Sequence, residues 1–171
     1  DSAALIQAAD DAATLPVIDR FIDEGDKVIL VGPEGAGKSI LMQQIAMCIA
    51  TATPFLGCLT VPKRRRVLYL NAEGKVRDMK KRLKRMSLVI PLTDEGTMTW
   101  GFAGNFAIDS PQGRADVEQL IRDHQPEVVV YDPLYMSMLG SLSDEKDARV
   151  VQAVFNHWAL QYGITQLVPT H

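Results

Sequence analysis

A glycine-rich run of eight residues dictates the local fold around it: Gly32-Pro33-Glu34-Gly35-Ala36-Gly37-Lys38-Ser39. A short β-branched run, 27–31, precedes it, and an apolar run of helical length, 40–50, follows it. Two glycines separated by four residues, with Lys and Ser directly after the second, are typical of a loop that points its backbone N–H groups at phosphates. The pattern therefore predicts a strand, a phosphate-binding loop and a helix, in that order.

The residues of this run also predict what the loop binds. Lys38 can neutralise the β and γ phosphates of a nucleoside triphosphate, and the hydroxyl of Ser39 can ligate Mg²⁺. The N-terminus of the following helix adds positive potential. We therefore expect ATP and Mg²⁺ as ligands, with nucleotide contacts from Pro33, Glu34, Gly35, Ala36, Gly37, Lys38, Ser39 and Ile40.

Strand-like and helix-like runs alternate along the rest of the chain. Short β-branched or aromatic runs predict strands at 27–31, 66–70, 97–102, 127–132 and 164–168, the first of them buried on both faces. Apolar residues three or four apart predict helices at 39–50, 76–86, 112–124 and from 144 onward. This order predicts an α/β fold, with a mainly parallel sheet covered by helices on both faces. Residues 1–16 are expected to form an alanine-rich N-terminal segment, either a short helix or poorly ordered, and 17–171 one core.

Two acidic residues follow predicted strands at the edge where parallel sheets bind ligands. Asp132 ends the run Val128-Val129-Val130-Tyr131, which suits a carboxylate that holds the water shell of Mg²⁺. Many ATPases place a water-activating glutamate directly after this aspartate, but position 133 is proline. Glu73, which follows the strand at 66–70, is therefore the candidate catalytic base; a helix-start glutamate is the simpler alternative.

The last predicted strand ends in Thr170 and His171, where a polar side chain could sense the γ phosphate. Pro169 is unusual so close to the end of a strand that should be central, because proline cannot donate to the ladder. The sequence begins with aspartate and ends directly after an apolar run, so we expect a piece of a longer protein, truncated at its C-terminal end.

Three runs together resemble the RecA-like ATPases: Gly32 to Ser39, Leu70-Asn71-Ala72-Glu73 and Val129-Val130-Tyr131-Asp132-Pro133-Leu134. Within these AAA family ATPase domains the sequence is most similar to the RepA-like group of hexameric replicative helicases, over about residues 16 to 171. The resemblance implies that Glu73 activates water, that Asp132 serves Mg²⁺ and that His171 links the γ phosphate to DNA-binding loops. It also implies a homo-hexamer that hydrolyses ATP between subunits on single-stranded DNA.

Two other functions remain open at this point. A nucleotide-switched recombination or regulatory module would use ATP to control assembly without unwinding DNA. A small-molecule phosphotransferase would need an acceptor pocket and a late lid with arginines, whereas the arginines here cluster before position 86.

The net charge of −3 conceals a strong asymmetry. Residues 63–85 contain 11 basic residues against two acidic ones, Glu73 and Asp78, and so carry +9, which leaves −12 on the rest of the chain. Three interpretations remain open for this basic segment: a solvated surface, a subunit interface with the acidic remainder, or contact with the phosphates of a nucleic acid. Aromatic residues that could stack on bases are scarce in it.

The composition excludes several other classes of protein. Cys48 and Cys58 lack the spacing of a disulfide framework or a zinc site, which favours a reducing, cytoplasmic compartment. No run approaches the roughly 18 apolar residues of a membrane helix. We therefore expect a cytoplasmic protein that does not contact a membrane.

Overall fold

The computed structural model describes residues 2, 15–91, 97–102 and 106–170. The elements follow one another as β1 (Pro16–Ile18), β2 (Ile22–Asp23), β3 (Lys27–Val31), α2 (Lys38–Thr51), β4 (Val67–Asn71), α3 (Val76–Met86), β5 (Met98–Phe102), α4 (Pro111–His124), β6 (Val128–Asp132), the short 3₁₀ helix η1 (Leu134–Ser137), α5 (Glu145–Tyr162) and β7 (Thr165–Thr170). The segment expected at 1–16 lies almost entirely outside the described residues.

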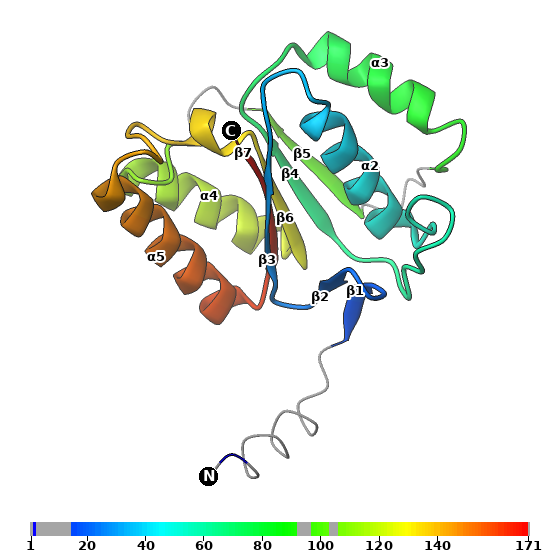
Figure 1. Cartoon of the computed structure of the whole chain (residues 1–171), viewed down its shortest axis with the longest axis horizontal. Coiled ribbons are helices and arrows are strands. Elements are labelled where there is room, and N and C mark those ends of the chain that lie inside the picture. Colours follow the sequence, from blue (N-terminus) through cyan, green and yellow to red (C-terminus); the bar gives the residue numbers. More distant parts are fainter. Residues whose placement is uncertain (1, 3–14, 92–96, 103–105, 171) are drawn as a thin grey trace.

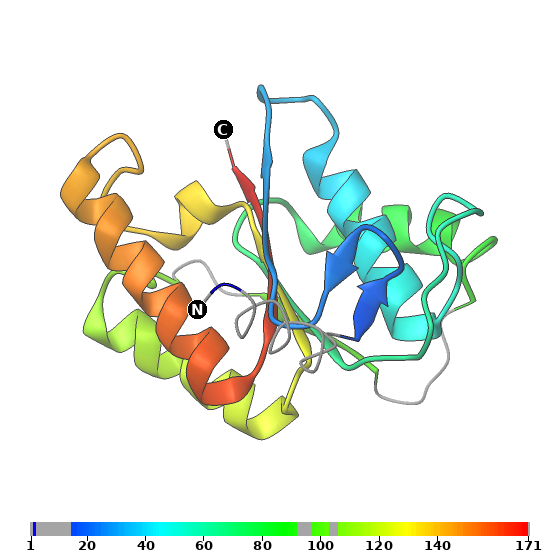
Figure 2. The ribbon, with the colours of Figure 1, turned by 60° about the horizontal axis from the view of Figure 1, so that its bottom comes forward.

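Five strands form one sheet in the order β3-β7-β6-β4-β5, and every neighbouring pair is parallel. Helices α2 and α3 lie on one face of this sheet and α4 and α5 on the other (Figure 1). The short antiparallel hairpin β1–β2 lies at the end of the sheet opposite the β3–α2 loop, on the α2 side (Figure 2). The predicted α/β class with a parallel sheet covered on both faces is confirmed.

Two apolar cores fill the spaces between the layers. Helix α2 buries Met42, Ile45 and Ile49 against the strands, which is why its sequence is apolar almost all round. On the opposite face α4 and α5 pack against the sheet through residues such as Val117 and Trp158. The sheet strands β4 and β6 are buried along their whole length, because each lies between two strands and two helical layers.

Local capping sets the ends of the two helices on the second face. The Ser110 side chain accepts a hydrogen bond from the Gly113 N–H, and Pro111 occupies the first turn of α4. The Asp144 side chain accepts hydrogen bonds from two N–H groups in the first turn of α5, and Gly163 ends that helix at φ 64°. Asp144 thus marks the end of the connection between η1 and α5, and Gly163 marks the turn from α5 into β7.

Strand β3 differs from the prediction of a strand buried on both faces. It is an edge strand that pairs only with β7, and its side chains alternate in burial. Ile29 and Val31 are 62% and 66% exposed, because α4 and α5 cover the strands further into the sheet. A β-branched run does not distinguish an edge strand from a central one, since strand order is set by contacts far away in the sequence.

Strand β7 accommodates Pro169 through its register. Its ladder with β6 joins Val128 to Thr165 and ends at the pair Val130–Leu167, two residues before the proline. At position 169 the strand pairs only with Leu30 of β3. A residue without an N–H is tolerated there because β7 no longer pairs with β6 at this position.

No helix in the described ranges is both long and apolar enough to cross a membrane.

Candidate functional site

The glycine-rich loop joins the C-terminal end of β3 to the first turn of α2. Gly35 and Gly37 have φ values of 75° and 87°, in the left-handed region that glycine adopts without strain. Gly37 occupies the N-cap position of α2, and the first turn of that helix contains no acidic side chain. The positive end of the helix dipole therefore faces the space in front of the loop.

Lys38 folds back across this loop. Its Nζ donates hydrogen bonds to the carbonyl oxygens of Gly32, at 2.6 Å, and Pro33, at 2.8 Å. The ammonium group is thus held at the mouth of the loop by neutral acceptors, which a phosphate oxygen can replace with a stronger, charge-assisted partner.

Asp132 lies at the last position of β6 with only 1% of its surface exposed. Its Oδ1 accepts a hydrogen bond from the Ser39 hydroxyl at 2.8 Å, and its Oδ2 accepts a short hydrogen bond from the Tyr69 hydroxyl. Burial raises the pKa of Asp132, and these two donors oppose that shift by favouring the charged form. The arrangement places a carboxylate and a hydroxyl side by side at the loop.

Glu73 lies two residues beyond β4, at the same edge of the sheet, because Asn71 at the end of β4 pairs in register with Asp132. Its Oε2 accepts a hydrogen bond of 2.8 Å from the hydroxyl of Tyr135, which belongs to η1. Burial and the neighbouring Glu73 carboxylate raise the pKa of Tyr135 to about 12. Tyr135 is therefore a neutral donor to Glu73 over the physiological range.

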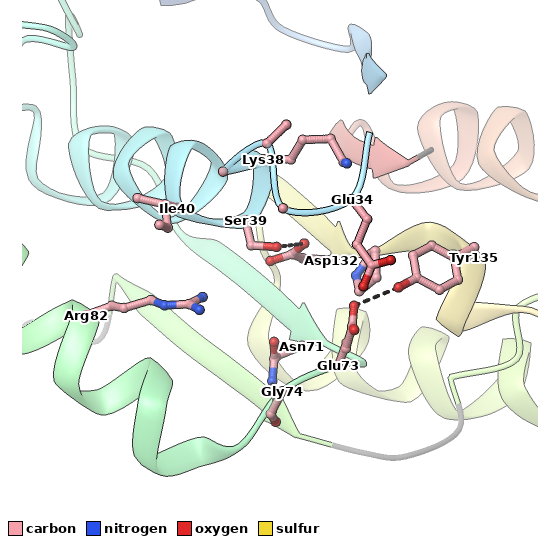
Figure 3. Close-up of a pocket in the computed structure, with 14 residues that line it drawn as sticks. Glu34, Lys38, Ser39, Ile40, Asn71, Glu73, Gly74, Arg82, Asp132 and Tyr135 are labelled. Carbon is pink, nitrogen blue, oxygen red and sulfur yellow. Dashed lines mark hydrogen bonds between the residues drawn. The ribbon is translucent and has the colours of Figure 1, made fainter. Parts of the chain in front are cut away.

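These groups surround one pocket of about 320 Å³, a size within the range of small-ligand sites. Figure 3 shows Glu73, Asp132 and Ser39 facing it from three different elements, with Lys38 above the loop and the Arg82 side chain extending toward it from α3. The residues that line it are Glu34, Gly35, Ala36, Gly37, Lys38, Ser39, Ile40, Asn71, Glu73, Gly74, Arg82, Asp132, Pro133 and Tyr135.

Nearly all residues selected from the sequence meet at this pocket. Pro33 belongs to the loop but does not line the pocket, and its carbonyl accepts from Lys38. His171 lies outside the described residues, so its sensing role stays a prediction. Thr170 ends β7 next to Val31, the last residue of β3.

Sequence reasoning missed five of the lining residues: Gly74 and Pro133, and the polar residues Asn71, Arg82 and Tyr135. Asn71 could have been found, because it ends a strand at the ligand-binding edge. Arg82 follows Met79 by three residues and so lies beside the apolar stripe of α3, on the side turned toward the sheet. Nothing in the sequence indicates that Tyr135, after a proline turn, reaches Glu73.

The basic segment does not form one surface. Arg65 is 2% exposed and contacts Glu24 and Glu127, and Lys63 contacts the same two acids. The basic residues of α3 are exposed, and the ion pairs found on this helix involve its own Asp78. Arg65 is thus part of the packed fold, whereas the cations of α3 lie on the surface.

The chemistry of the pocket fits a magnesium nucleotide. Ser39 Oγ and Asp132 Oδ1 lie 2.8 Å apart at the loop. Both are hard oxygen donors, the type of ligand that Mg²⁺ prefers. Lys38 and Arg82 supply positive charge for phosphates on the same pocket. These residues would hold the ion and the triphosphate together.

Comparisons with known proteins agree with this geometry. The sequence profile of the AAA domain family matches residues 2–171. Among curated proteins, none matches the chain. A KaiC-like protein from the hyperthermophilic archaeon Pyrococcus horikoshii OT3 is similar in structure, with a TM-score of 0.60, 17% sequence identity and coverage of 92% of this chain and 70% of that one. The chain therefore belongs to the AAA domain family and has the RecA-like fold of the P-loop ATPases.

Proposed function

We propose that this chain is the ATPase core of a RecA-like motor that hydrolyses Mg²⁺-bound ATP, and that it drives a replicative-type helicase of the RepA-like group. The observation that carries the ATPase part is the convergence on one pocket of Lys38 and Ser39 from the start of α2, Asp132 from the end of β6 and Glu73 from the loop after β4. The helicase part rests on the sequence resemblance.

In the proposed reaction the loop binds the triphosphate before any bond changes. Backbone N–H groups of the loop and the Lys38 ammonium group bind the β and γ phosphates, and Lys38 exchanges the carbonyl oxygens of Gly32 and Pro33 for phosphate oxygens. Ser39 and Asp132 would hold Mg²⁺, which would supply charge neutralisation for the triphosphate. Arg82 adds a second cation from the opposite wall of the pocket.

Glu73 is the proposed base. Its carboxylate orients a water molecule and accepts its proton while the water oxygen bonds to the γ phosphorus. The bond between the γ phosphorus and the β–γ bridging oxygen breaks, which yields ADP and inorganic phosphate. Tyr135 donates to Oε2, so Oε1 of the same carboxylate is left to face the water.

Substitution of the two central residues tests this reaction. Lys38→Ala should lose binding of a fluorescent ATP analogue, because the only loop cation is removed. Glu73→Gln should keep that binding and lose hydrolysis by about 100-fold or more, since a general base contributes roughly this much. Glu34→Gln is the competing variant, because Glu34 also lines the pocket. Normal turnover by Glu73→Gln, or a larger loss with Glu34→Gln, would show that the base is assigned to the wrong residue.

Single-stranded DNA is the proposed track, and α3 is the described element best suited to contact its phosphates. Its exposed cations face solvent with Asp78 as the one acidic residue of the helix. DNA-stimulated ATP hydrolysis distinguishes this motor from a nucleotide-switched regulatory module, in which turnover should not respond to DNA. A phosphotransferase would instead transfer the phosphate to a small acceptor.

The same proposal includes a homo-hexamer, with ATP bound between subunits and His171 as the γ-phosphate sensor. Mass measurement with and without an ATP analogue, on a chain extended past His171, tests it. A nucleotide-dependent ring supports the motor, and a persistent monomer contradicts it.

A further inference from the structure

Tyr69 is a buried polar residue beside the proposed metal site for which the reaction above gives no role. It lies in the middle of β4 with none of its surface exposed. Its hydroxyl donates a short hydrogen bond to Asp132 Oδ2, and the carbonyl oxygen of Ser39 lies 3.4 Å from the same hydroxyl. Tyr69 thus joins α2, β4 and β6 at one point.

The backbone register explains how the phenol reaches the carboxylate. Tyr69 pairs with Val130, two residues before Asp132, on a neighbouring parallel strand. Residues two apart on a strand share a face, so Tyr69 and Asp132 both face α2. The ring packs on Trp100, with centroids 4.8 Å apart, which restricts its movement within the core.

The two oxygens of Asp132 consequently have different partners. Oδ2 is occupied by Tyr69, and Oδ1 faces the Ser39 hydroxyl. The Asp132 carboxylate can rotate about its Cβ–Cγ bond, and a hydrogen-bond donor to one of its oxygens restricts that rotation. The Tyr69 bond therefore determines which oxygen is presented to the metal side of the pocket.

The neighbouring strand provides an internal comparison. Tyr131 is also fully buried, one residue before Asp132 on β6, but it faces the α5 side and packs on Phe155 and Trp158. Its hydroxyl has no hydrogen-bond partner among the described residues. The two tyrosines match in burial and differ in whether the hydroxyl contacts the carboxylate.

We propose that Tyr69 is a positioning residue that holds the Asp132 carboxylate in the orientation required to bind Mg²⁺ with Ser39. The inference rests on the proposed function and deepens it. Tyr69 touches neither nucleotide nor metal in this arrangement, and it acts through Asp132.

The test compares Tyr69→Phe with Tyr131→Phe, both of which keep the aromatic ring. Mn²⁺ replaces Mg²⁺ so that the free ion can be followed by electron paramagnetic resonance in the presence of an ATP analogue. Tyr69→Phe should weaken Mn²⁺ binding by about tenfold, as the loss of a hydrogen bond to a metal ligand commonly does. Its affinity for the analogue in EDTA should equal that of the unmodified protein. Tyr131→Phe should change neither quantity.

Each outcome decides a separate point. If the unmodified protein binds neither the analogue nor Mn²⁺, the proposed function itself is wrong. If it binds both and Tyr69→Phe binds Mn²⁺ equally well, Tyr69 has no positioning role. Equal losses in both variants would also overturn the inference, because the effect would then follow from disturbing the core; urea unfolding of both variants measures that disturbance directly.

Discussion

The basic residues between Lys63 and Arg85 form two groups with opposite surroundings. The group before β4 meets acids that are distant in the sequence: Arg65 Nη1 lies 2.5 Å from Glu24 Oε1 and 3.5 Å from Glu127 Oε1. Arg65 also donates to the carbonyl oxygen of Pro16, so it joins the β1–β2 hairpin to the sheet. The group on α3 has Asp78 of its own helix as its ion-pair partner, at 3.9 Å.

This difference shows that a run of charge in a sequence does not predict a charged surface. In the first group Arg65 is buried against the fold, and Glu24 and Glu127 offset part of the group's positive charge. The second group is exposed to solvent, and its charges add to a positive potential on one helix. The three interpretations left open by the sequence therefore apply to the exposed cations of the segment, most of which lie on α3.

Arg65→Ala should cause the largest loss in the free energy of unfolding. Removing one member of a fully buried ion pair costs about 3–5 kcal/mol. Glu24 and Glu127 are 39% and 31% exposed and keep Lys63 as a partner, so we expect a smaller cost of about 2–3 kcal/mol. Urea unfolding measures it, with Lys80→Ala on α3 as the control, expected within about 0.5 kcal/mol of the unmodified protein. Equal stabilities would remove the distinction between the groups.

The next largest effect concerns the affinity for single-stranded DNA, and it should follow from substitutions on α3. Replacing Arg77, Lys80 and Lys84 together with glutamine removes three cations from one face of the helix. If they contact phosphates, the slope of log affinity for single-stranded DNA against log salt should fall by about 2, at roughly 0.7 per contact. Fluorescence anisotropy with a labelled oligonucleotide measures the slope. A slope equal to that of the unmodified protein would leave α3 as a solvated surface or an interface between subunits.

A smaller loss of stability is expected for Glu127→Gln. Glu127 contacts Lys63, Arg65 and Arg66, and its Oε2 also accepts from the Arg66 N–H at 3.1 Å. Glutamine keeps the size of the side chain and removes its charge, so about 1 kcal/mol should be lost. The loss should shrink in high salt, because the charges are partly exposed. A loss that is the same at low and high salt would contradict an electrostatic origin.

Asp78→Ala should have the smallest effect on stability. It removes the acid that pairs with Arg77 and Lys81 on α3. Exposed pairs and a first-turn acid each contribute a few tenths of a kcal/mol to helix stability. DNA binding should change in the opposite direction and become slightly tighter, since the helix gains net positive charge. Thermal unfolding and anisotropy on the same samples check both signs, and weaker DNA binding would argue against phosphate contacts.

The sequence predicted the order of the elements well, because burial on one or two faces leaves a periodic pattern of apolar residues. It placed Gly32 to Ser39, Glu73 and Asp132 at one edge because the ends of parallel strands meet there. It could not place β3 at the edge of the sheet, since strand order depends on contacts between distant segments. The hydrogen bonds of the Tyr69 and Tyr135 hydroxyls were also missed. The sequence around a tyrosine in an apolar run does not show whether its hydroxyl contacts a carboxylate from another segment.

The edge position of β3 has a mechanical consequence for the loop that it carries. A central strand shares any sideways force with neighbours on both sides, whereas β3 is restrained by β7 alone. The exposed side chains of Ile29 and Val31 lie within one strand's length of the glycine-rich loop. The glycine-rich loop is therefore carried by a strand that has one neighbour in the sheet among the described residues and a largely exposed outer face.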